Sequence, residues 1–377
     1  MAGIYIHIPF CRRRCYYCDF FSVGSRNAPW ESYASALLNE AHARRSEIRG
    51  ESVRTLYIGG GTPSQMPLPL LEEIIRGMCD TIIEANDVTE ITVELNPEDV
   101  TPELAGRLRA AGVNRVSMGI QSFIDSELRT VGRRHTSEQA KESYRILSRE
   151  FSNISIDLIF GLPTQSLTSW EYSVSEAIAL NPTHISAYSL MWEERSALSQ
   201  MQRQGRAEEC DEELSDKMYL HLTRELKAAS YEHYEISNYS RAGYRSLHNS
   251  SYWRGDAYLG LGAGAHSYDG ERIRRSNRED IARYIAHFSG SGGAKRPFYE
   301  EEILCDEELR EEYIMTRLRR SEGIEMEDYR HRFGEKAFRD LHAKSSRLNG
   351  MVLLSEGRLR LCGEGLMRSD TAIVNLL

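Results

Sequence analysis

Long apolar runs are absent from this sequence. No stretch of its 377 residues approaches the roughly 20 consecutive apolar residues that a membrane-spanning helix needs. The first residues are apolar and precede the basic run Arg12–Arg14, whereas a signal peptide has these two features in the opposite order. We therefore expect a cytoplasmic protein with no transmembrane segment.

The sequence also lacks an excess of positive charge. Its net charge is −9, whereas proteins that bind nucleic acid broadly usually present a basic surface. Nucleic acid is therefore not an expected partner. An apolar content of 41% and a charged content of 27% are typical of a globular protein, and the length allows one large and one smaller domain.

Cysteines are few, and their number is odd. The chain has 7 of them, which fits a reducing compartment in which thiols stay free. Three lie in one short segment, at Cys11, Cys15 and Cys18. The other four stand alone in the sequence and are interpreted as structural thiols, namely Cys79, Cys210, Cys305 and Cys362.

The cysteine segment has the spacing C-x3-C-x2-C and follows a strand-like run from Gly3 to Pro9. Thiols this close are poorly placed for disulfides with one another, but they suit an iron–sulfur cluster, which prefers soft sulfur ligands. Since no fourth cysteine lies nearby, one iron of a four-iron cluster would keep an open position. A zinc site or a set of buried thiols is the alternative.

The same spacing resembles that of the radical SAM enzymes. The resemblance implies a [4Fe–4S] cluster whose open iron takes the amino and carboxylate groups of S-adenosylmethionine. It also implies that one electron from the cluster splits the sulfonium and releases a 5′-deoxyadenosyl radical. In such enzymes the cofactors supply the difficult chemistry, and the protein supplies orientation and electrostatics.

Short β-branched runs alternate with amphipathic stretches, which predicts a parallel sheet with helical crossovers. The predicted strands are Ile4–Ile8, Thr55–Gly59, Glu90–Leu95, Arg115–Ile120, Ser155–Phe160 and His184–Leu190. The predicted helices include Trp30–Glu47, Leu68–Ile83, Ser137–Arg149 and Ser166–Leu180, and one more that begins after the N-cap Thr101. Six units are too few for an eight-unit barrel. The expected α/β fold is a partial (β/α)6 barrel, which the radical SAM resemblance also implies.

Unusual residues follow five of the predicted strands, at the end where functional residues of such folds gather. They are Cys11, Gly59–Pro63, Asn96–Pro97, Gln121–Ser122 and Gly161–Pro163. Without Cβ atoms, the glycines Gly59, Gly60 and Gly61 would let the backbone approach a ligand closely. A glycine-rich turn is also common in purely structural connections. We predict that this rim is the active site.

Longer strings resemble the oxygen-independent coproporphyrinogen III oxidase family across nearly the whole chain. They are Ile91–Pro97, Arg115–Phe123, Val131–Arg133, Ile156–Pro163 and Asn181–Met191. The resemblance implies that S-adenosylmethionine contacts Tyr5, Tyr17, Gly60, Gly61, Thr62, Glu94, Gln121, Arg133, Asp157 and Met191. Arg133 can bind a carboxylate through two parallel hydrogen bonds. Glu94 and Asp157 can accept hydrogen bonds from ribose hydroxyls or the ammonium group, and Tyr17 can pack on adenine. The structural alternative for a buried Asp or Arg is an ion pair.

The string His248-Asn-x-x-Tyr252-Trp253 is uninformative by composition, because a lone histidine is more often an ordinary core or surface residue than a ligand. It resembles a mark of the HemW heme chaperones, which are relatives of the oxidases. That resemblance implies His248 as an axial ligand of heme iron, with Tyr252 and Trp253 beside the macrocycle. The run Gly260–Gly264 lacks the βαβ context of a dinucleotide loop, so we expect a glycine-rich strand near the rim.

Two domains are expected, a barrel with the cluster loop and extra strands over residues 1–290 and a C-terminal domain over residues 297–377. The Ser/Gly-rich segment Ser289–Lys295 is the predicted linker. In the second domain we expect helices over Glu308–Arg319, Ile324–Phe333 and Lys336–Asn349, then a β-hairpin that turns at Glu356–Gly357. This order resembles a winged-helix module, and its mixed charge favours a lid or packing role over DNA binding.

Two functions from different classes follow from these resemblances. The first is a radical SAM heme chaperone that binds heme and delivers it to target proteins, and the second is a coproporphyrinogen oxidase that makes protoporphyrinogen IX. Three features favour the chaperone. Phe20 stands where the oxidases have a fourth cysteine, Cys11 lies almost at the start of the sequence, and the string at His248 belongs to the chaperone branch. An electron donor such as flavodoxin or ferredoxin is the implied partner, and no catalytic residue is assigned.

Overall fold

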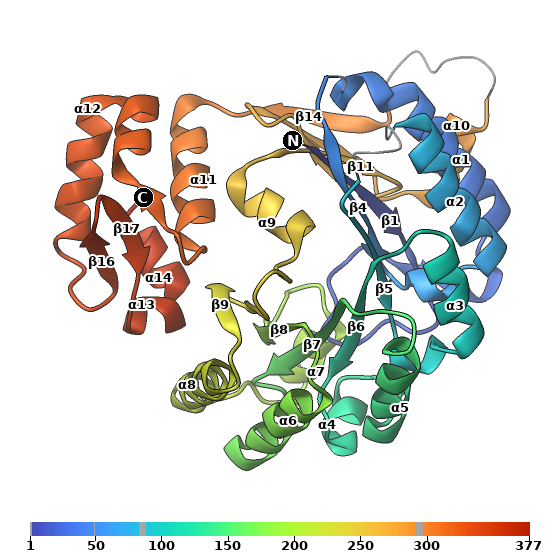
Figure 1. The fold of residues 1–377 in the computed structure, drawn as a ribbon, viewed down its shortest axis with the longest axis horizontal. Coiled ribbons are helices and arrows are strands. Elements are labelled where there is room, and N and C mark those ends of the chain that lie inside the picture. The colour runs from blue at the N-terminus through green and yellow to red at the C-terminus, as the bar shows by residue number, and fades with distance from the viewer. Residues whose placement is uncertain (1, 49, 83–87, 291–296) are drawn as a thin grey trace.

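One curved sheet of twelve strands dominates the computed structural model, which describes residues 2–48, 50–82, 88–290 and 297–377 (Figure 1). Its middle strands all run parallel. In spatial order they are β11 (Ala257–Leu261), β1 (Ala2–Ile8), β4 (Val53–Gly60), β5 (Glu90–Leu95), β6 (Arg115–Gln121), β7 (Ile154–Phe160) and β8 (His184–Ser189). The order does not close on itself, so the predicted partial barrel is confirmed.

Helices cover the convex face of this sheet (Figure 1). They are α1 (Trp30–Arg44), α2 (Leu68–Thr81), α3 (Pro102–Ala110), α4 (Asp125–Thr130), α5 (Ser137–Leu147), α6 (Leu167–Leu180) and α10 (Ile281–Phe288). Alternate residues of each strand face them, as Ile4, Ile6 and Ile8 of β1 show with 0% exposure. The intervening Tyr5 and His7 therefore face the concave side, where the site lies.

The six predicted strands and the predicted helices of the first half are confirmed, with bounds that differ by a few residues at most. Thr101 caps α3 as predicted, since its hydroxyl accepts a hydrogen bond from Leu104 N at 3.1 Å. Asn181 ends α6 in the left-handed conformation with φ 55°, a geometry that asparagine tolerates.

Short antiparallel strands extend the sheet at both edges. Beside β11 lie β12 (His266–Tyr268), β13 (Ile273–Asn277) and β14 (Tyr299–Ile303), and beside β8 lie β10 (Asn238–Ser240) and β9 (Glu232–Glu235). Of the run Gly260–Gly264, expected to form a glycine-rich strand near the rim, only Gly260 and Leu261 lie in a strand, β11, which pairs with β1. Gly262 and Gly264 follow in a turn, so the prediction is wrong for them. Strand β14 follows the domain boundary expected at residue 297, yet it pairs with β13 and so belongs to the large sheet.

The remaining elements of the first unit lie between β8 and β11. Helices α7 (Ala197–Arg203) and α8 (Glu212–Ala228) follow β8, and α9 (Leu247–Arg254) lies inside the curve of the sheet (Figure 1). A two-stranded pair, β2 (Phe10–Cys11) and β3 (Val23–Gly24), brackets the cysteine segment. Short 3-10 helices stand at Ser25–Asn27, Arg45–Ile48, Pro63–Gln65 and Pro97–Asp99.

The C-terminal unit has its own apolar core, built from residues such as Ile314, Leu341, Leu359 and Ile373. Its elements are α11 (Asp306–Leu318), β15 (Ile324–Glu325), α12 (Met326–Ser345), β16 (Val352–Ser355), β17 (Arg358–Leu361), α13 (Glu364–Met367) and α14 (Ser369–Val374). The strands form a separate antiparallel sheet in the order β15-β17-β16. The winged-helix assignment of this unit stays a prediction.

Within this unit the predicted hairpin is confirmed, and its turn residues Glu356 and Gly357 have φ 51° and 73°. The two helices predicted on either side of Gly334 are confirmed, because α12 is broken at Gly334, where φ 84° and ψ 172° are not helical. Their outer ends are shorter than predicted: the first begins at Met326, after the short strand β15, and the second ends at Ser345. The predicted linker, from residue 291 onward, lies outside the described residues.

Ion pairs and backbone contacts hold the C-terminal unit against the first. Arg317 of α11 donates to the carbonyls of Trp253 and Arg254 at the end of α9, and Arg274 of β13 forms two hydrogen bonds with Glu312 at 2.8 and 2.6 Å. Forked contacts of this kind add geometric specificity. Among the described residues, no helix combines the length and apolar character that crossing a membrane requires.

Candidate cluster and cofactor site

The three clustered cysteines lie beyond the carboxyl end of β1: Cys11 ends β2, and Cys15 and Cys18 lie in the loop between β2 and β3. Cys11 is buried, Cys15 and Cys18 are partly exposed, and all three are free thiols. The backbone N–H of Cys18 donates to the carbonyl of Cys15 at 3.2 Å, which closes a tight turn between them. Thr62, in the loop after β4, donates to Cys11 Sγ at 3.5 Å.

This donor set fits an iron–sulfur cluster. Burial raises the pKa of the Cys18 thiol to about 11, and the neighbouring Cys15 and Cys11 thiols add to the shift, so the three sulfurs lie within electrostatic reach of one another. In the part of the chain that the structure describes, no group of three such side chains forms a site for a single metal ion. A cluster instead takes each thiolate on a different iron, and binding releases the thiol protons.

Arg133 connects the cysteine loop to the rim of the sheet. Its guanidinium donates to Cys15 Sγ at 3.6 Å, to Asn96 Oδ1 at 2.9 Å and to the carbonyl of Gly119. Asn96 in turn donates to Thr62 Oγ1 at 3.2 Å. The Arg133 Nε is buried without a hydrogen-bond partner among the described residues, so one donor beside the thiols is left for an acceptor such as a carboxylate.

The glycine run at the end of β4 lets the backbone lie directly against neighbouring side chains. A Cβ on Gly60, which has φ 106°, would lie 2.4 Å from the His7 ring, and one on Gly59 would lie 2.8 Å from the Glu94 carboxyl. Gly60 N donates to Glu94 Oε2 at 3.2 Å, and Tyr57 donates to the other oxygen at 2.7 Å. The close approach expected of these glycines is therefore present.

Glu94 is a buried carboxyl of this rim that changes its protonation state near neutral pH. Burial raises the pKa of its carboxyl to about 7, and the nearby Asp157 acts in the same direction, while the bonds from Tyr57 and Gly60 oppose the shift. A cation placed beside Glu94, such as an ammonium group, would favour the ionised carboxylate.

This pKa predicts a pH-dependent stability. Because the folded pKa of Glu94 lies above its ordinary value of 4.5, the folded state holds a proton that the unfolded state releases between about pH 4.5 and 7. The free energy of unfolding should therefore fall as pH rises from 5 to 8, by no more than about 3 kcal/mol for a shift of this size. Urea unfolding at several pH values measures it, and Glu94→Gln should lose this slope.

The matched control for that experiment is Glu72→Gln. The hydrogen bonds from the Arg107 guanidinium lower the pKa of Glu72 below its ordinary value of 4.5, and Arg107 stays charged between pH 5 and 8. The Glu72 carboxyl is thus ionised in both states above pH 5, and its replacement should keep the wild-type slope between pH 5 and 8. A Glu94→Gln variant with the same slope as wild type would contradict the expectation.

The other residues that the resemblance implied are spread along the rim. Tyr17 packs against Val131, Ile159 and Leu162. Gln121 ends β6 with φ 70°, and Asp157 of β7 accepts from Ser117 Oγ at 3.3 Å. Met191 follows β8, and 66% of its surface is exposed. It takes no part in the contacts described above.

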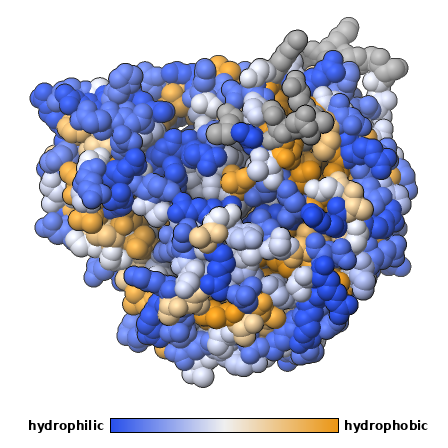
Figure 2. Space-filling model, viewed as in Figure 1, coloured by the Kyte–Doolittle hydropathy of each residue, from blue (hydrophilic) through white to orange (hydrophobic). Residues whose placement is uncertain are grey.

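A cavity of about 890 Å³ lies between the rim, α9 and the C-terminal unit. The implied residues Tyr5, Gly60, Glu94 and His248 line it, as do side chains from β11, β12, α11 and α12. Figure 2 shows the corresponding face of the molecule, where hydrophilic side chains dominate and apolar ones reach the surface over the sheet. The sequence did not predict this cavity, because its walls come from distant parts of the chain.

His248 is a buried hydrogen-bonding group on the wall of this cavity. Its Nδ1 bonds to Thr55 Oγ1 at 2.7 Å and its Nε2 to Tyr252 OH at 2.8 Å, and its ring stacks on Tyr57. The residue is 1% exposed, and burial lowers its pKa to about 3, so the imidazole is neutral. Iron ligation by His248 would require the bond to Tyr252 to break.

Sequence reasoning missed several residues that complete the site. His7 hydrogen-bonds Tyr5 OH at 2.9 Å and donates to the Phe21 carbonyl at 2.8 Å. Tyr57 donates to Glu94 at 2.7 Å. Asn96, which the sequence did place on the rim, links Arg133 to Thr62. The alternation of β1, in which Tyr5 and His7 share the face opposite three buried isoleucines, is the signal that could have found His7.

Comparison with known proteins places the chain among its relatives. Residues 5–176 match the family model of the Radical SAM superfamily, and residues 304–368 match that of the HemN C-terminal domain. The chain is 34% identical to the heme chaperone HemW of Bacillus subtilis over 97% of this chain and 96% of that protein. It is 35% identical to the heme chaperone HemW of Escherichia coli over 73% of each. The chain belongs to the HemW family.

Comparison with a solved structure shows the same fold. Coproporphyrinogen III oxidase (HemN) from Escherichia coli, described as a radical SAM enzyme, superposes with a TM-score of 0.83 over 100% of this chain and 89% of that chain, at 21% identity. At that identity the likeness shows a shared fold. For this HemW-family chain, the Radical SAM superfamily match implies a [4Fe–4S] cluster and S-adenosylmethionine.

Proposed function

We propose that this chain is a heme chaperone, which binds heme in the cavity beside the cysteine loop and delivers it to heme-accepting target proteins. The lining of the cavity is the observation that carries the proposal. Aromatic side chains line it from three separate segments, among them Tyr57, Tyr252 and Phe333. Heme is a flat, apolar macrocycle, and aromatic walls of this kind suit it.

Cationic side chains line the same cavity on the side of α9 and the C-terminal unit. They are Arg254, Arg274, Arg317 and Arg332. Arg274 already pairs with Glu312, and Arg317 with two backbone carbonyls, so the two propionates of heme, which are carboxylates, would bind to the donors that these contacts leave free. The HemW relatives, which carry the name heme chaperone and match over most of this chain, support the same function.

In this proposal Cys11, Cys15 and Cys18 hold the [4Fe–4S] cluster and leave one iron for S-adenosylmethionine. When bound, the pair supplies an electron and a cleavable sulfonium. Arg133 Nε, which has no partner among the described residues, would bind the carboxylate, and Glu94 would accept from the ammonium beside Gly60. The other proposed contacts are Tyr5, Tyr17, Gly61, Thr62, Gln121, Asp157 and Met191.

The proposed electron donor is a small acidic protein such as a flavodoxin or ferredoxin. Arg12, Arg13 and Arg14 are exposed within the cysteine loop and give its surface a positive charge. Opposite charge on the donor would speed its encounter with this surface. A reducing compartment such as the cytoplasm, in which the free thiols persist, is the setting we propose.

A hemin titration combined with an anaerobic turnover assay tests the function. The protein is reconstituted with iron and sulfide, and absorbance follows the addition of hemin. The same preparation is then incubated with coproporphyrinogen III, S-adenosylmethionine and a reductant. We expect saturable binding of one heme per chain and no protoporphyrinogen.

The two assays separate the two candidate functions. Sustained formation of protoporphyrinogen would make the chain an oxidase and overturn the chaperone. Absence of saturable heme binding would also overturn it.

A further inference from the structure

Strand β12 presents its side chains to two opposite environments. Ser267 faces the convex side, where its hydroxyl accepts from Arg44 at 3.1 Å and from Gly260 N at 2.9 Å. Successive side chains of a strand point to opposite faces, so His266 and Tyr268 face the other way. Both line the cavity of about 890 Å³ beside the cysteine loop.

Three histidines line this cavity, and their ring nitrogens differ in what they contact. His7 uses both, with Tyr5 OH and the Phe21 carbonyl, and His248 uses both, with Thr55 and Tyr252. The ring nitrogens of His266 make no hydrogen bond within the part of the chain described, and the residue is exposed to the cavity.

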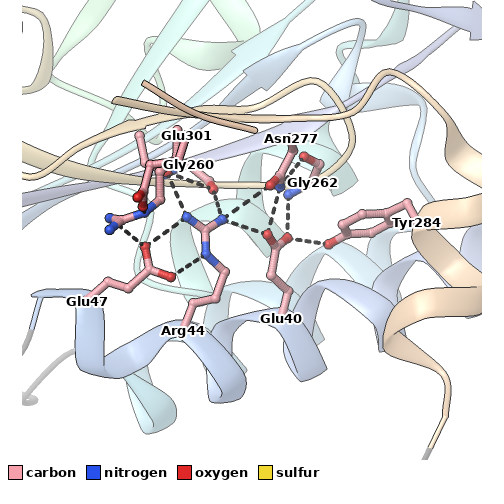
Figure 3. A network of polar contacts seen from close by, with 10 residues as sticks. Glu40, Arg44, Glu47, Gly260, Gly262, Asn277, Tyr284 and Glu301 are labelled. Atoms are coloured by element: carbon pink, nitrogen blue, oxygen red, sulfur yellow. Dashed lines mark hydrogen bonds and ion pairs between the residues drawn. The ribbon is translucent and has the colours of Figure 1, made fainter. Parts of the chain in front are cut away.

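The backbone that carries His266 is tightly fixed. A Cβ on Gly260 would lie 1.9 Å from the His266 carbonyl oxygen, so only glycine allows β11 and β12 to approach this closely. A buried polar network holds the same segment from behind: Gly262 N donates to Glu40 at 2.8 Å, and Arg44 donates to the Gly260 carbonyl at 3.0 Å (Figure 3). The fixed backbone sets the point from which the His266 imidazole reaches into the cavity, while the ring itself is free to turn toward a ligand.

We propose that His266 is the axial ligand of the heme iron in this cavity, a role that rests on the proposed heme binding. Neutral imidazole is a common axial ligand of heme iron. Partial desolvation at the cavity wall and the nearby Arg274 lower the pKa of His266 from its ordinary value, which favours the neutral ring with a lone pair available for iron. Tyr268, on the same face of β12, would then stand beside the macrocycle.

Hemin titrations of four proteins test this assignment: wild type, His266→Ala, His248→Ala and the control His42→Ala, whose histidine is exposed on α1 outside the cavity. Electronic absorption and electron paramagnetic resonance report the axial ligand directly. We expect His266→Ala to lose the imidazole-bound spectrum and to bind hemin at least about tenfold more weakly. Added imidazole should restore the spectrum in that variant, which a purely structural defect would not allow.

The possible outcomes distinguish the assignment of His266 as the ligand from the proposed heme binding itself. Wild-type spectra in His266→Ala, with tight hemin binding, would overturn the ligand assignment and leave the chaperone intact. Loss of the spectrum in His248→Ala, but not in His266→Ala, would restore His248 as the ligand. Failure of the wild-type protein to bind hemin would overturn both proposals. Circular dichroism of each variant establishes that it is folded.

Discussion

Replacement of Cys15 by serine should abolish the iron–sulfur cluster and leave the fold intact. A serine hydroxyl stays protonated at neutral pH and is a hard ligand, so it does not substitute for a thiolate on iron. The loss of the cluster should be complete, because the cluster has only three thiolate ligands and no fourth cysteine lies beside them to replace Cys15. Iron and sulfide content after anaerobic reconstitution, together with the cluster absorbance, measures the effect.

The fold should survive because Cys15 stands outside the packed interior. It is partly exposed in the loop between β2 and β3, and the main apolar core does not include it. The far-UV circular dichroism and the unfolding midpoint of the cluster-free protein should match those of cluster-free wild type. Global unfolding of Cys15→Ser would instead show that this thiol is structural.

Cys305→Ser is the matched control. This cysteine is exposed at the start of α11, and serine is a favourable residue at a helix N-cap. The variant should therefore retain full iron content. If Cys15→Ser also retained its iron, the three-cysteine site would be wrong.

The parts of this molecule that local patterns encode could be predicted from the sequence. Strands β1 and β4 to β8 are short β-branched runs flanked by turn-forming residues. Their parallel order follows from their alternation with helices. The rim followed from the same logic, because the carboxyl ends of parallel strands meet at one edge. Thr62, Asn96 and Arg133 lie in three different loops, yet they form one hydrogen-bonded chain beside the cysteines.

What could not be predicted depends on contacts between distant segments. The edge strands are short, and β14 reads Tyr-Glu-Glu-Glu-Ile, which has no apolar alternation. The walls of the cavity come from β1, α9 and α12, so no local sequence pattern indicates it. The ligand expected at His248 came from a string of residues, whereas the state of its ring nitrogens depends on Thr55, 193 residues away.

The pair Glu40 and Arg44 shows the same limit on a single helix. At a spacing of four residues on α1 it has the pattern of an exposed helical ion pair, which usually contributes a few tenths of a kcal/mol. In the structure, β11 to β13 cover it, and the side chains are 0% and 7% exposed. Position in the fold, which the sequence pattern does not reveal, therefore decides the energetics of the pair.

Glu40→Gln should be the most destabilising of the conservative substitutions outside the site. The carboxylate accepts four hydrogen bonds, from Arg44 at 2.8 Å, Asn277 at 2.7 Å, Gly262 N at 2.8 Å and Tyr284 OH at 2.6 Å (Figure 3). Glutamine has the same shape, but its amide replaces one acceptor with a donor that faces other donors. It also removes one of the two carboxylates that pair with the buried guanidinium of Arg44 and leaves only Glu47 to compensate that charge. Since breaking a buried pair outright costs about 3–5 kcal/mol, we expect a loss near the lower end, about 3 kcal/mol.

Urea unfolding at neutral pH measures this loss as a lower midpoint with an unchanged slope. The control is Glu31→Gln, an exposed carboxylate in the first turn of the same helix, which should change the free energy of unfolding by at most about 1 kcal/mol. An unchanged midpoint in Glu40→Gln would show that the network contributes little net stability. Because the network also fixes Gly262 and the strand of His266, the same variant should broaden the heme spectrum even where it remains folded.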